Sequence, residues 1–214
     1  MQIKICGITN SRDGLACAEA GADMIGLNFC ERSPRYIAPD QARTIARALP
    51  SRTRAVGVFV DIPVEQIRRV ALDVDLRILQ LHGSESPEMC AELARDFEII
   101  KALRIGEGFN ARQASAYSMC TILLDTYDEQ LAGGTGEVGD WEIAREIRKL
   151  AARLILAGGL SPENVAKAIT KVNPDGVDVC SSLESAPGIK DLKRVQQFVN
   201  AVRNAEKVGA TRAR

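Results

Sequence analysis

A thiol and a carboxyl group end two short apolar runs of this sequence. Cys6 follows the run "IKI" and stands directly before Gly7, and Asp125 closes the run "TILLD". A thiol that has lost its proton can act as a base, and a protonated carboxyl group can act as an acid. Cysteine is also common as a small buried apolar residue, and Asp125 could instead cap a turn, so both interpretations stay open from the residues alone.

A second group of residues has the chemistry of an anion site. Gly158-Gly159 follows the run "LILA", and Ser181-Ser182 follows the run "VDVC". Glycines expose backbone N–H groups, serines add hydroxyl donors, and "SLES" could begin a short helix whose N-terminus favours negative charge. We therefore expect a phosphate monoester to bind here without needing a lysine or an arginine.

Three further features are ambiguous. Arg35, in the proline-flanked stretch "SPRYIAP", could hold a carboxylate with its planar fork or be an ordinary surface arginine. The glycine-rich stretch "GGTGEVGDW" (residues 133–141) could fold over a ligand or only form turns, with Asp140 capping a helix that begins at Trp141. His82, in "LQLHG", is expected to bond a loop carbonyl rather than to line the site.

The strands and helices that must position these residues form a repeating pattern in the sequence. Aliphatic and β-branched runs alternate with segments of helical period, about every 27 residues, and several helices open with a capping residue and a proline. This alternation predicts the α/β class and a single (β/α)8 TIM barrel with eight parallel strands, at residues 3–6, 24–29, 55–60, 76–81, 98–103, 121–125, 153–157 and 176–180. A doubly wound open sheet is the alternative, but no GxGxxG follows the first strand.

In such a barrel the active site lies at the carboxyl ends of the strands. Alternation along a strand then turns Lys4 and Cys6 to the same side, and Asp125, Asp178 and Cys180 also point inward. Strands one and eight are neighbours in a closed barrel. We expect Lys4 and Asp178 to pair beneath the site, because a single unpaired charge there would be costly.

Composition excludes several classes of function. The 214 residues hold 28 Lys+Arg and 28 Asp+Glu, so bulk charge gives no reason to expect nucleic-acid or membrane binding. No apolar run approaches the ~20 residues of a membrane span, and no signal peptide precedes the first strand, so a cytoplasmic location is expected. One histidine and six scattered cysteines predict free thiols and no metal site. Residues 1–206 are expected to form the barrel and residues 207–214 a frayed tail.

The motifs "KICGIT", "SPRYI", "LQLHG", "LLDT", "GGTG", "LAGGL" and "DVCSSLESAPGIKD" occur in this order. Together they resemble the phosphoribosylanthranilate isomerases of tryptophan biosynthesis. The resemblance implies one (β/α)8 barrel, a monomer or homodimer, without cofactor or metal, that carries out an Amadori rearrangement of a phosphosugar. It implies Cys6 as general base, Asp125 as general acid and Arg35 as ligand of the anthranilate carboxylate. By the same resemblance the phosphate is held by Gly158, Gly159, Ser181 and Ser182.

The sequence departs from that family at Ser182, where glycine is usual, and at Gly139, where an aromatic residue is usual. Asn28 and Cys30 also stand where an apolar and an aromatic residue are more common. Ser182 is compatible with the site only if its φ is negative. Two other functions stay open. One is a phosphosugar isomerase or synthase of the histidine-pathway type, in which an aspartate typically ends strand one, and the other is a barrel that only binds a phosphosugar.

Overall fold

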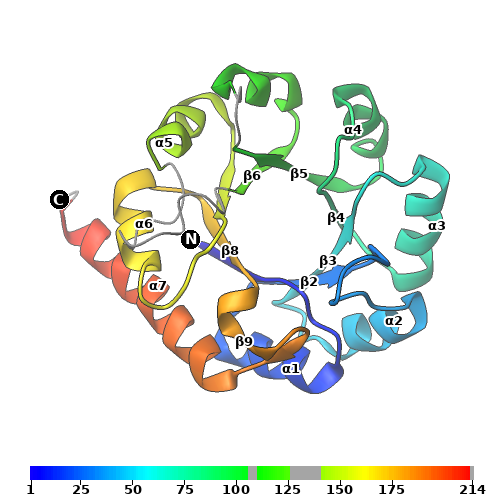
Figure 1. Cartoon of the computed structure of the whole chain (residues 1–214), viewed down its shortest axis with the longest axis horizontal. Helices are drawn as coiled ribbons and strands as arrows, with labels where there is room; N and C mark the ends of the chain where they lie inside the picture. Colours follow the sequence, from blue (N-terminus) through cyan, green and yellow to red (C-terminus); the bar gives the residue numbers. More distant parts are fainter. Residues whose placement is uncertain (106–109, 126–140, 213–214) are drawn as a thin grey trace.

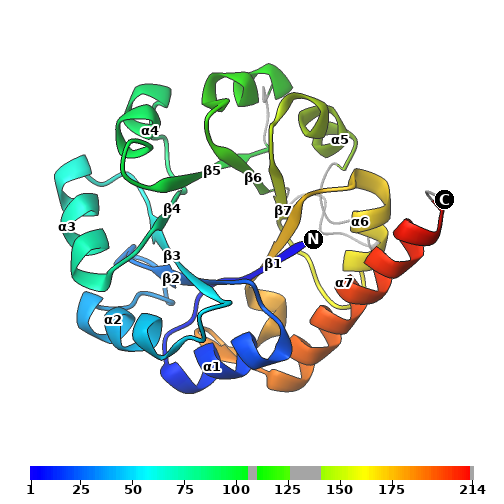
Figure 2. The same ribbon diagram turned by 180° about the vertical axis from the view of Figure 1, so that it is seen from behind.

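The computed structural model describes residues 1–105, 110–125 and 141–212. Parallel strands, each paired with the next and the last paired with the first, close a barrel that is surrounded by helices (Figures 1 and 2). The predicted barrel is confirmed, and most strand ends agree within one residue. The eight strands are β1 Gln2–Ile5, β2 Met24–Asn28, β3 Arg54–Phe59, β4 Ile78–Leu81, β5 Glu98–Arg104, β6 Thr121–Asp125, β7 Leu154–Ala157 and β8 Gly176–Val179.

The helices form the outer layer of the barrel (Figure 1). They are α1 Ser11–Ala20, α2 Pro39–Ala48, α3 Val64–Val74, α4 Pro87–Leu93, α5 Trp141–Leu150, α6 Val165–Val172 and α7 Leu192–Arg212. Of the predicted helix starts with a capping residue and a proline, the one at Ser86 is confirmed, because the Ser86 side chain accepts from the Met89 N–H and Pro87 follows it. Helices α2, α3 and α6 begin without a side-chain cap. Asn10, which was not predicted as a cap, accepts from the Asp13 N–H at the start of α1.

The structure corrects three details of the expected pattern. Between β5 and β6 the described residues form a 3-10 helix, η1 (Ala111–Tyr117), where an α-helix was expected. After β8, where a short helix was expected in "SLES", the chain forms a short 3-10 turn, η2 (Ser181–Leu183). An antiparallel hairpin of β9 (Glu184–Ala186) and β10 (Ile189–Lys190) follows it, which the sequence analysis missed. Helix α7 continues through residues 207–212, which were expected to fray.

Apolar side chains fill two separate regions of the barrel. A large cluster lies between the strands and the helices, and a smaller one fills the inside of the barrel. The smaller cluster takes one residue from each of β2, β3, β4 and β6 and two alternate residues from each of β5 and β7: Met24, Val56, Ile78, Leu123, Ile100, Ala102, Ile155 and Ala157. Because packed apolar side chains occupy that interior, polar groups are available to a ligand only where the strands end. Within the described residues no helix is both long and apolar enough to cross a membrane.

A buried ion pair outside the barrel interior shapes the turn after β4. Lys101 on β5 and Glu85 are both almost fully buried, with Lys101 Nζ 2.9 Å from Glu85 Oε2. Lys101 Nζ also donates to the carbonyls of Leu81 and Gly83, and Glu85 accepts from the N–H groups of Asp61 and Gly83. The pair therefore fixes the loop that follows His82.

Replacing one partner of this pair leaves the other charge buried without compensation. We expect Lys101→Met to lower the free energy of unfolding by about 3–5 kcal/mol, measured by urea denaturation. The matched control is Arg54→Gln, because the Arg54–Glu98 pair on the surface has a similar distance of 2.9 Å but exposed side chains. That change should cost at most about 1 kcal/mol. Equal losses in the two variants would contradict the structural role assigned to Lys101.

Candidate active site

The carboxyl ends of the barrel strands surround a cavity of about 530 Å³. Residues from all eight strand ends line it, and six of these ends contribute groups that could take part in chemistry or in binding. These include Cys6, Arg35, His82, Asp125, Gly158, Gly159, Asp178, Cys180 and Ser181. The structure thus brings every proposed site residue except Ser182 to one cavity.

Two glycines explain how the thiol of Cys6 fits at the end of β1. Gly7 has a φ of 75°, which lets the chain turn directly after Cys6. A Cβ atom at Gly7 would lie 2.6 Å from Arg35 Cδ, and one at Gly26 would lie 2.6 Å from Cys6 Sγ. The absence of both Cβ atoms allows the Cys6 sulfur to lie against β2 and the stem of Arg35 to cross the turn.

The surroundings of Cys6 favour its thiolate. A hydrogen bond from the Cys180 side chain lowers the pKa of Cys6 most, and the ammonium groups of Lys4 and Lys190 lower it further against the opposing effect of burial. The same contact raises the pKa of Cys180 well above its usual value, with burial as the second cause. Cys6 therefore carries the negative charge of the pair, and Cys180 keeps its proton.

Lys4 and Asp178 form the predicted pair beneath the thiol. Lys4 Nζ lies 3.0 Å from Asp178 Oδ1, and both side chains are buried. Burial raises the pKa of Asp178 to about 6 although Lys4 opposes this shift, so the carboxylate is still charged at neutral pH. Burial lowers the pKa of Lys4, but Asp178 and Cys6 raise it by more, so the ammonium stays charged as well. The prediction that the two residues pair is confirmed.

Asp125 lies close to His82, which the sequence analysis did not expect to line the site. His82 Nε2 lies 3.6 Å from Asp125 Oδ2, and His82 Nδ1 lies 2.7 Å from the side-chain nitrogen of Gln80. The expectation that the His82 ring bonds a loop carbonyl is therefore wrong, because the ring faces the cavity between Gln80 and Asp125. Alternation along β4 was the available signal, since it turns Gln80 and His82 to the inner face together.

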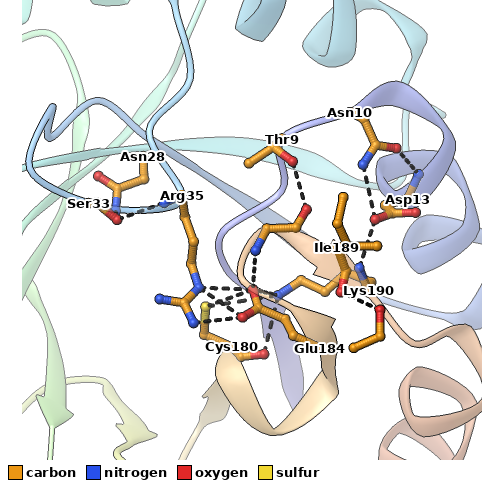
Figure 3. A network of polar contacts seen from close by, with 12 residues as sticks. Thr9, Asn10, Asp13, Asn28, Ser33, Arg35, Cys180, Glu184, Ile189 and Lys190 are labelled. Carbon is orange, nitrogen blue, oxygen red and sulfur yellow. Dashed lines mark hydrogen bonds and ion pairs between the residues drawn. The ribbon is translucent and has the colours of Figure 1, made fainter.

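Arg35 is held by the hairpin that follows β8 (Figure 3). Its Nε and Nη2 atoms donate to the carboxylate of Glu184 at 2.6–3.0 Å. Glu184 also accepts from Lys190 Nζ at 2.9 Å, and Lys190 Nζ donates to the carbonyl of Cys180 at 3.2 Å. The Ser33 hydroxyl accepts from the Arg35 N–H and so fixes the loop that carries Arg35 (Figure 3). Arg35 is thus a positioned guanidinium at the cavity wall and not a freely solvated one.

The expected phosphate segments meet on the side of β7 and β8. Gly158 and Gly159 have φ values of 88° and 61°, and both line the cavity together with Ser181. The Ser182 hydroxyl instead donates to the Leu160 carbonyl, which joins the two loops. Ser182 is not among the described residues with positive φ. Its backbone is therefore compatible with a serine at a position where the family usually has glycine.

Parts of the expected site lie outside the described residues. These are the glycine-rich stretch at residues 133–140, the cap at Asp140 and the departure at Gly139. Within the described part of the chain, no cluster of three or more His, Cys, Asp or Glu side chains could hold a metal ion.

The thiol of Cys6 should react as a thiolate at lower pH than an ordinary cysteine. We expect the rate of alkylation by iodoacetamide at Cys6 to rise with pH around a midpoint below the usual value of about 8.5, followed by peptide mass spectrometry. Cys17 is an internal control, because burial raises its pKa to about 12. It should stay unmodified over the same pH range. A Cys6 midpoint above that of a model thiol would contradict the electrostatics described here.

Comparison with known proteins agrees with this geometry. The sequence matches the family described as N-(5'phosphoribosyl)anthranilate (PRA) isomerase over residues 3–201. It is 43% identical to the N-(5'-phosphoribosyl)anthranilate isomerase of Pelobacter propionicus, across 93% of this chain and 94% of that protein. It is 44% identical to the isomerase of Rubrobacter xylanophilus, across 95% and 99% of the two chains.

Solved structures give the same result. The phosphoribosyl anthranilate isomerase of Thermotoga maritima superposes with a TM-score of 0.89 at 41% identity, covering 95% of this chain and 99% of that chain. A structure of such an isomerase in complex with reduced 1-(o-carboxyphenylamino)-1-deoxyribulose 5-phosphate gives a TM-score of 0.87 at 39% identity, with coverage of 95% and 99%. The chain therefore belongs to the N-(5′-phosphoribosyl)anthranilate isomerase family of tryptophan biosynthesis.

Proposed function

We propose that this protein isomerises N-(5-phosphoribosyl)anthranilate to 1-(2-carboxyphenylamino)-1-deoxyribulose 5-phosphate with Cys6 as general base and Asp125 as general acid. The observation that carries the assignment of roles is that a thiol favoured as thiolate and a carboxyl group line one cavity. They come from β1 and β6, which are separated by two strands around the barrel. A sugar can therefore lie between them.

The reaction needs an acid first and a base second. Asp125 gives its proton to the furanose ring oxygen as the C1–O bond breaks, and the opened substrate becomes a protonated Schiff base. The positive nitrogen acidifies the hydrogen on C2, and the Cys6 thiolate removes that proton. The resulting enolamine then tautomerises to the ketone product. Lys4 cannot replace Cys6 as the base, because its raised pKa keeps it protonated.

His82 supports the acid. His82 Nε2 faces Asp125 at 3.6 Å, and in the tautomer in which Nδ1 accepts from the Gln80 amide, Nε2 carries the ring proton. Asp125 becomes a carboxylate once it has given its proton, and the ring N–H then faces a full negative charge. His82 thereby stabilises the product of the first step and holds the acid toward the cavity.

The two charged ends of the substrate are assigned to two groups of residues on the cavity wall. Arg35 binds the anthranilate carboxylate, and its pKa is raised chiefly by its hydrogen bond to Glu184, so it stays cationic. The amides of Gly158 and Gly159 and the hydroxyl of Ser181 bind the phosphate. Ser182 acts indirectly by fastening the β8 loop to Leu160. A phosphate and a carboxylate held at these two places would position C1 and C2 between acid and base.

The proposed function also implies a location, a set of partners and an oligomeric state for the protein. Residues 1–206 are proposed to act as one catalytic barrel in the cytoplasm, without cofactor or metal and without nucleic acid or membrane partners. The chain is proposed to work as a monomer or a homodimer. A Thermotoga maritima relative is described as dimeric and has also been obtained as monomers, at 39% identity to this chain.

Removing either proposed proton-transfer group tests the mechanism. We expect Cys6→Ala and Asp125→Asn each to lower kcat by about 10²-fold or more. The assay follows the fluorescence of freshly prepared phosphoribosylanthranilate with no added metal or nucleotide. Cys30→Ala is the matched control, because Cys30 lines the same cavity but has no assigned role.

Three outcomes of this test are informative. Normal turnover by Cys6→Ala would show that another group is the base. If wild-type protein binds the substrate but does not convert it, the alternative of a non-catalytic phosphosugar-binding barrel is favoured. Conversion of a histidine-pathway aminoaldose at a higher kcat/KM would favour the other isomerase class.

The proposed binding of the anthranilate carboxylate by Arg35 can be tested separately. Arg35→Lys keeps the charge but loses the planar fork, so KM should rise by about 10-fold or more while kcat changes less. Arg32→Lys is the control, since Arg32 also lines the cavity and comes from the same loop. A fall in kcat with unchanged KM would assign Arg35 to the chemical step and not to substrate binding.

A further inference from the structure

Two cysteines meet at the seam where the barrel closes. β1 and β8 are paired in register through Ile5 and Val179, so Cys6 and Cys180 occupy the next rung. The Cys6 N–H donates to the Val179 carbonyl at 2.9 Å, which continues the ladder to that rung. Alternation turns both side chains to the inner face, and both line the cavity.

The spacing of this rung is compatible with a disulfide. Neighbouring strands lie about 4.8 Å apart, and disulfide-bonded residues usually have Cα atoms about 4.4–6.8 Å apart. The Cys180 sulfur lies against the turn at Gly7, directly after Cys6, because a Cβ atom at Gly7 would lie only 2.9 Å from that sulfur. The Cys180 thiol donates a hydrogen bond to Glu184 Oε1 at 3.7 Å, and it also lies close enough to Cys6 for the two thiols to shift each other's pKa in opposite directions. Both cysteines follow the last residues of their strands, where small backbone adjustments cost less than inside a ladder.

The two thiols differ in acidity, and Cys6 is the one that favours the reactive anion. Cys6 lies near two ammonium groups, Lys4 and Lys190, that favour its anionic form, whereas Cys180 stays protonated beside it. A thiolate is the form that attacks an oxidant, and a second thiol nearby can resolve the product. The open cavity gives a small oxidant access to both sulfur atoms.

We propose that Cys6 and Cys180 form a reversible disulfide when the protein meets a peroxide. The Cys6 thiolate attacks one peroxide oxygen, the O–O bond breaks, and the other oxygen leaves as hydroxide. Cys6 is then a sulfenic acid. The Cys180 sulfur attacks the Cys6 sulfur, the S–O bond breaks, and the oxygen leaves as water with the proton of the Cys180 thiol. Both sulfur atoms are oxidised by one electron each, and the peroxide is reduced.

The disulfide removes the proposed base from the reaction. Its effect on activity rests on the role of Cys6 proposed above, but its formation does not. A dithiol restores both thiols, whereas further oxidation of Cys6 to a sulfinic acid is not reversed in this way. Cys180 would therefore protect the site, because it intercepts the sulfenic acid before a second peroxide reacts.

Peptide mapping tests the bond directly. Wild-type protein is treated with hydrogen peroxide, remaining thiols are blocked, and the protein is digested with trypsin without reduction. We expect a cross-linked species of residues 5–12 with residues 172–190, lighter than the two reduced peptides by two hydrogen atoms. Dithiothreitol should separate it. Activity should fall to about a hundredth, as for loss of a general base, and return with dithiothreitol.

Two variants are matched controls. Cys180→Ser should give no cross-link, and peroxide should convert Cys6 of this variant to sulfinic acid. The activity of the variant should then fall below that of its own untreated sample, and dithiothreitol should not restore it. Cys30→Ser, in the same cavity, should behave as wild type. Cys90 and Cys120, which likewise shift each other's pKa but are both buried, should stay reduced in all samples.

The outcomes separate this proposal from the proposed function. If Cys6 of the wild-type protein remains a thiol, becomes only sulfinic acid, or cross-links to Cys30, the disulfide proposal is overturned. If the cross-link forms but activity is retained, the disulfide is supported and the role of Cys6 as base is overturned.

Discussion

The pairing of the first barrel strand with the last one is the contact on which the site depends. The register of β1 and β8 sets Lys4 opposite Asp178 and carries Cys6 to the same rung as Cys180. Without this seam the ammonium of Lys4 would have no carboxylate partner, and the Cys6 sulfur would lose its contacts with Cys180 and Lys190. The electrostatics of the site thus depend on barrel closure as well as on Lys4, two residues before Cys6.

The arrangement also divides the barrel interior by polarity. Apolar side chains fill the inside of the barrel, and charged or polar groups gather where the strands end. Burying Lys4 and Asp178 is costly in itself, and a well-packed apolar pair would often be at least as stable. The surrounding apolar clusters supply the stability that allows this cost, and the site gains a thiol held close to a fixed positive charge.

Much of this organisation was predictable from sequence, because the signals are local. Two-residue alternation and capping residues place the strands and most helices, and the same alternation predicted the Lys4–Asp178 pair. The Arg35–Glu184 pair was not predictable in this way, since its partners are separated by 149 positions and meet only through a hairpin with two short strands. The 3-10 helix η1 was missed because its apolar pattern resembles that of an α-helix. The place of His82 could have been found, since Gln80 in an aliphatic strand already marks the inner face of β4.

The hairpin after β8 has a consequence for how the protein is made. Lys4 and Asp178 are 174 positions apart, and Lys190 comes from the hairpin later still. On the ribosome Cys6 emerges early together with Lys4, whereas Asp178, Cys180 and Lys190 are synthesised near the end. A nascent chain therefore lacks the Cys180 side chain, which has the largest effect on the pKa of Cys6, for almost the whole of translation. The complete surroundings of the thiol exist only once the molecule is nearly finished.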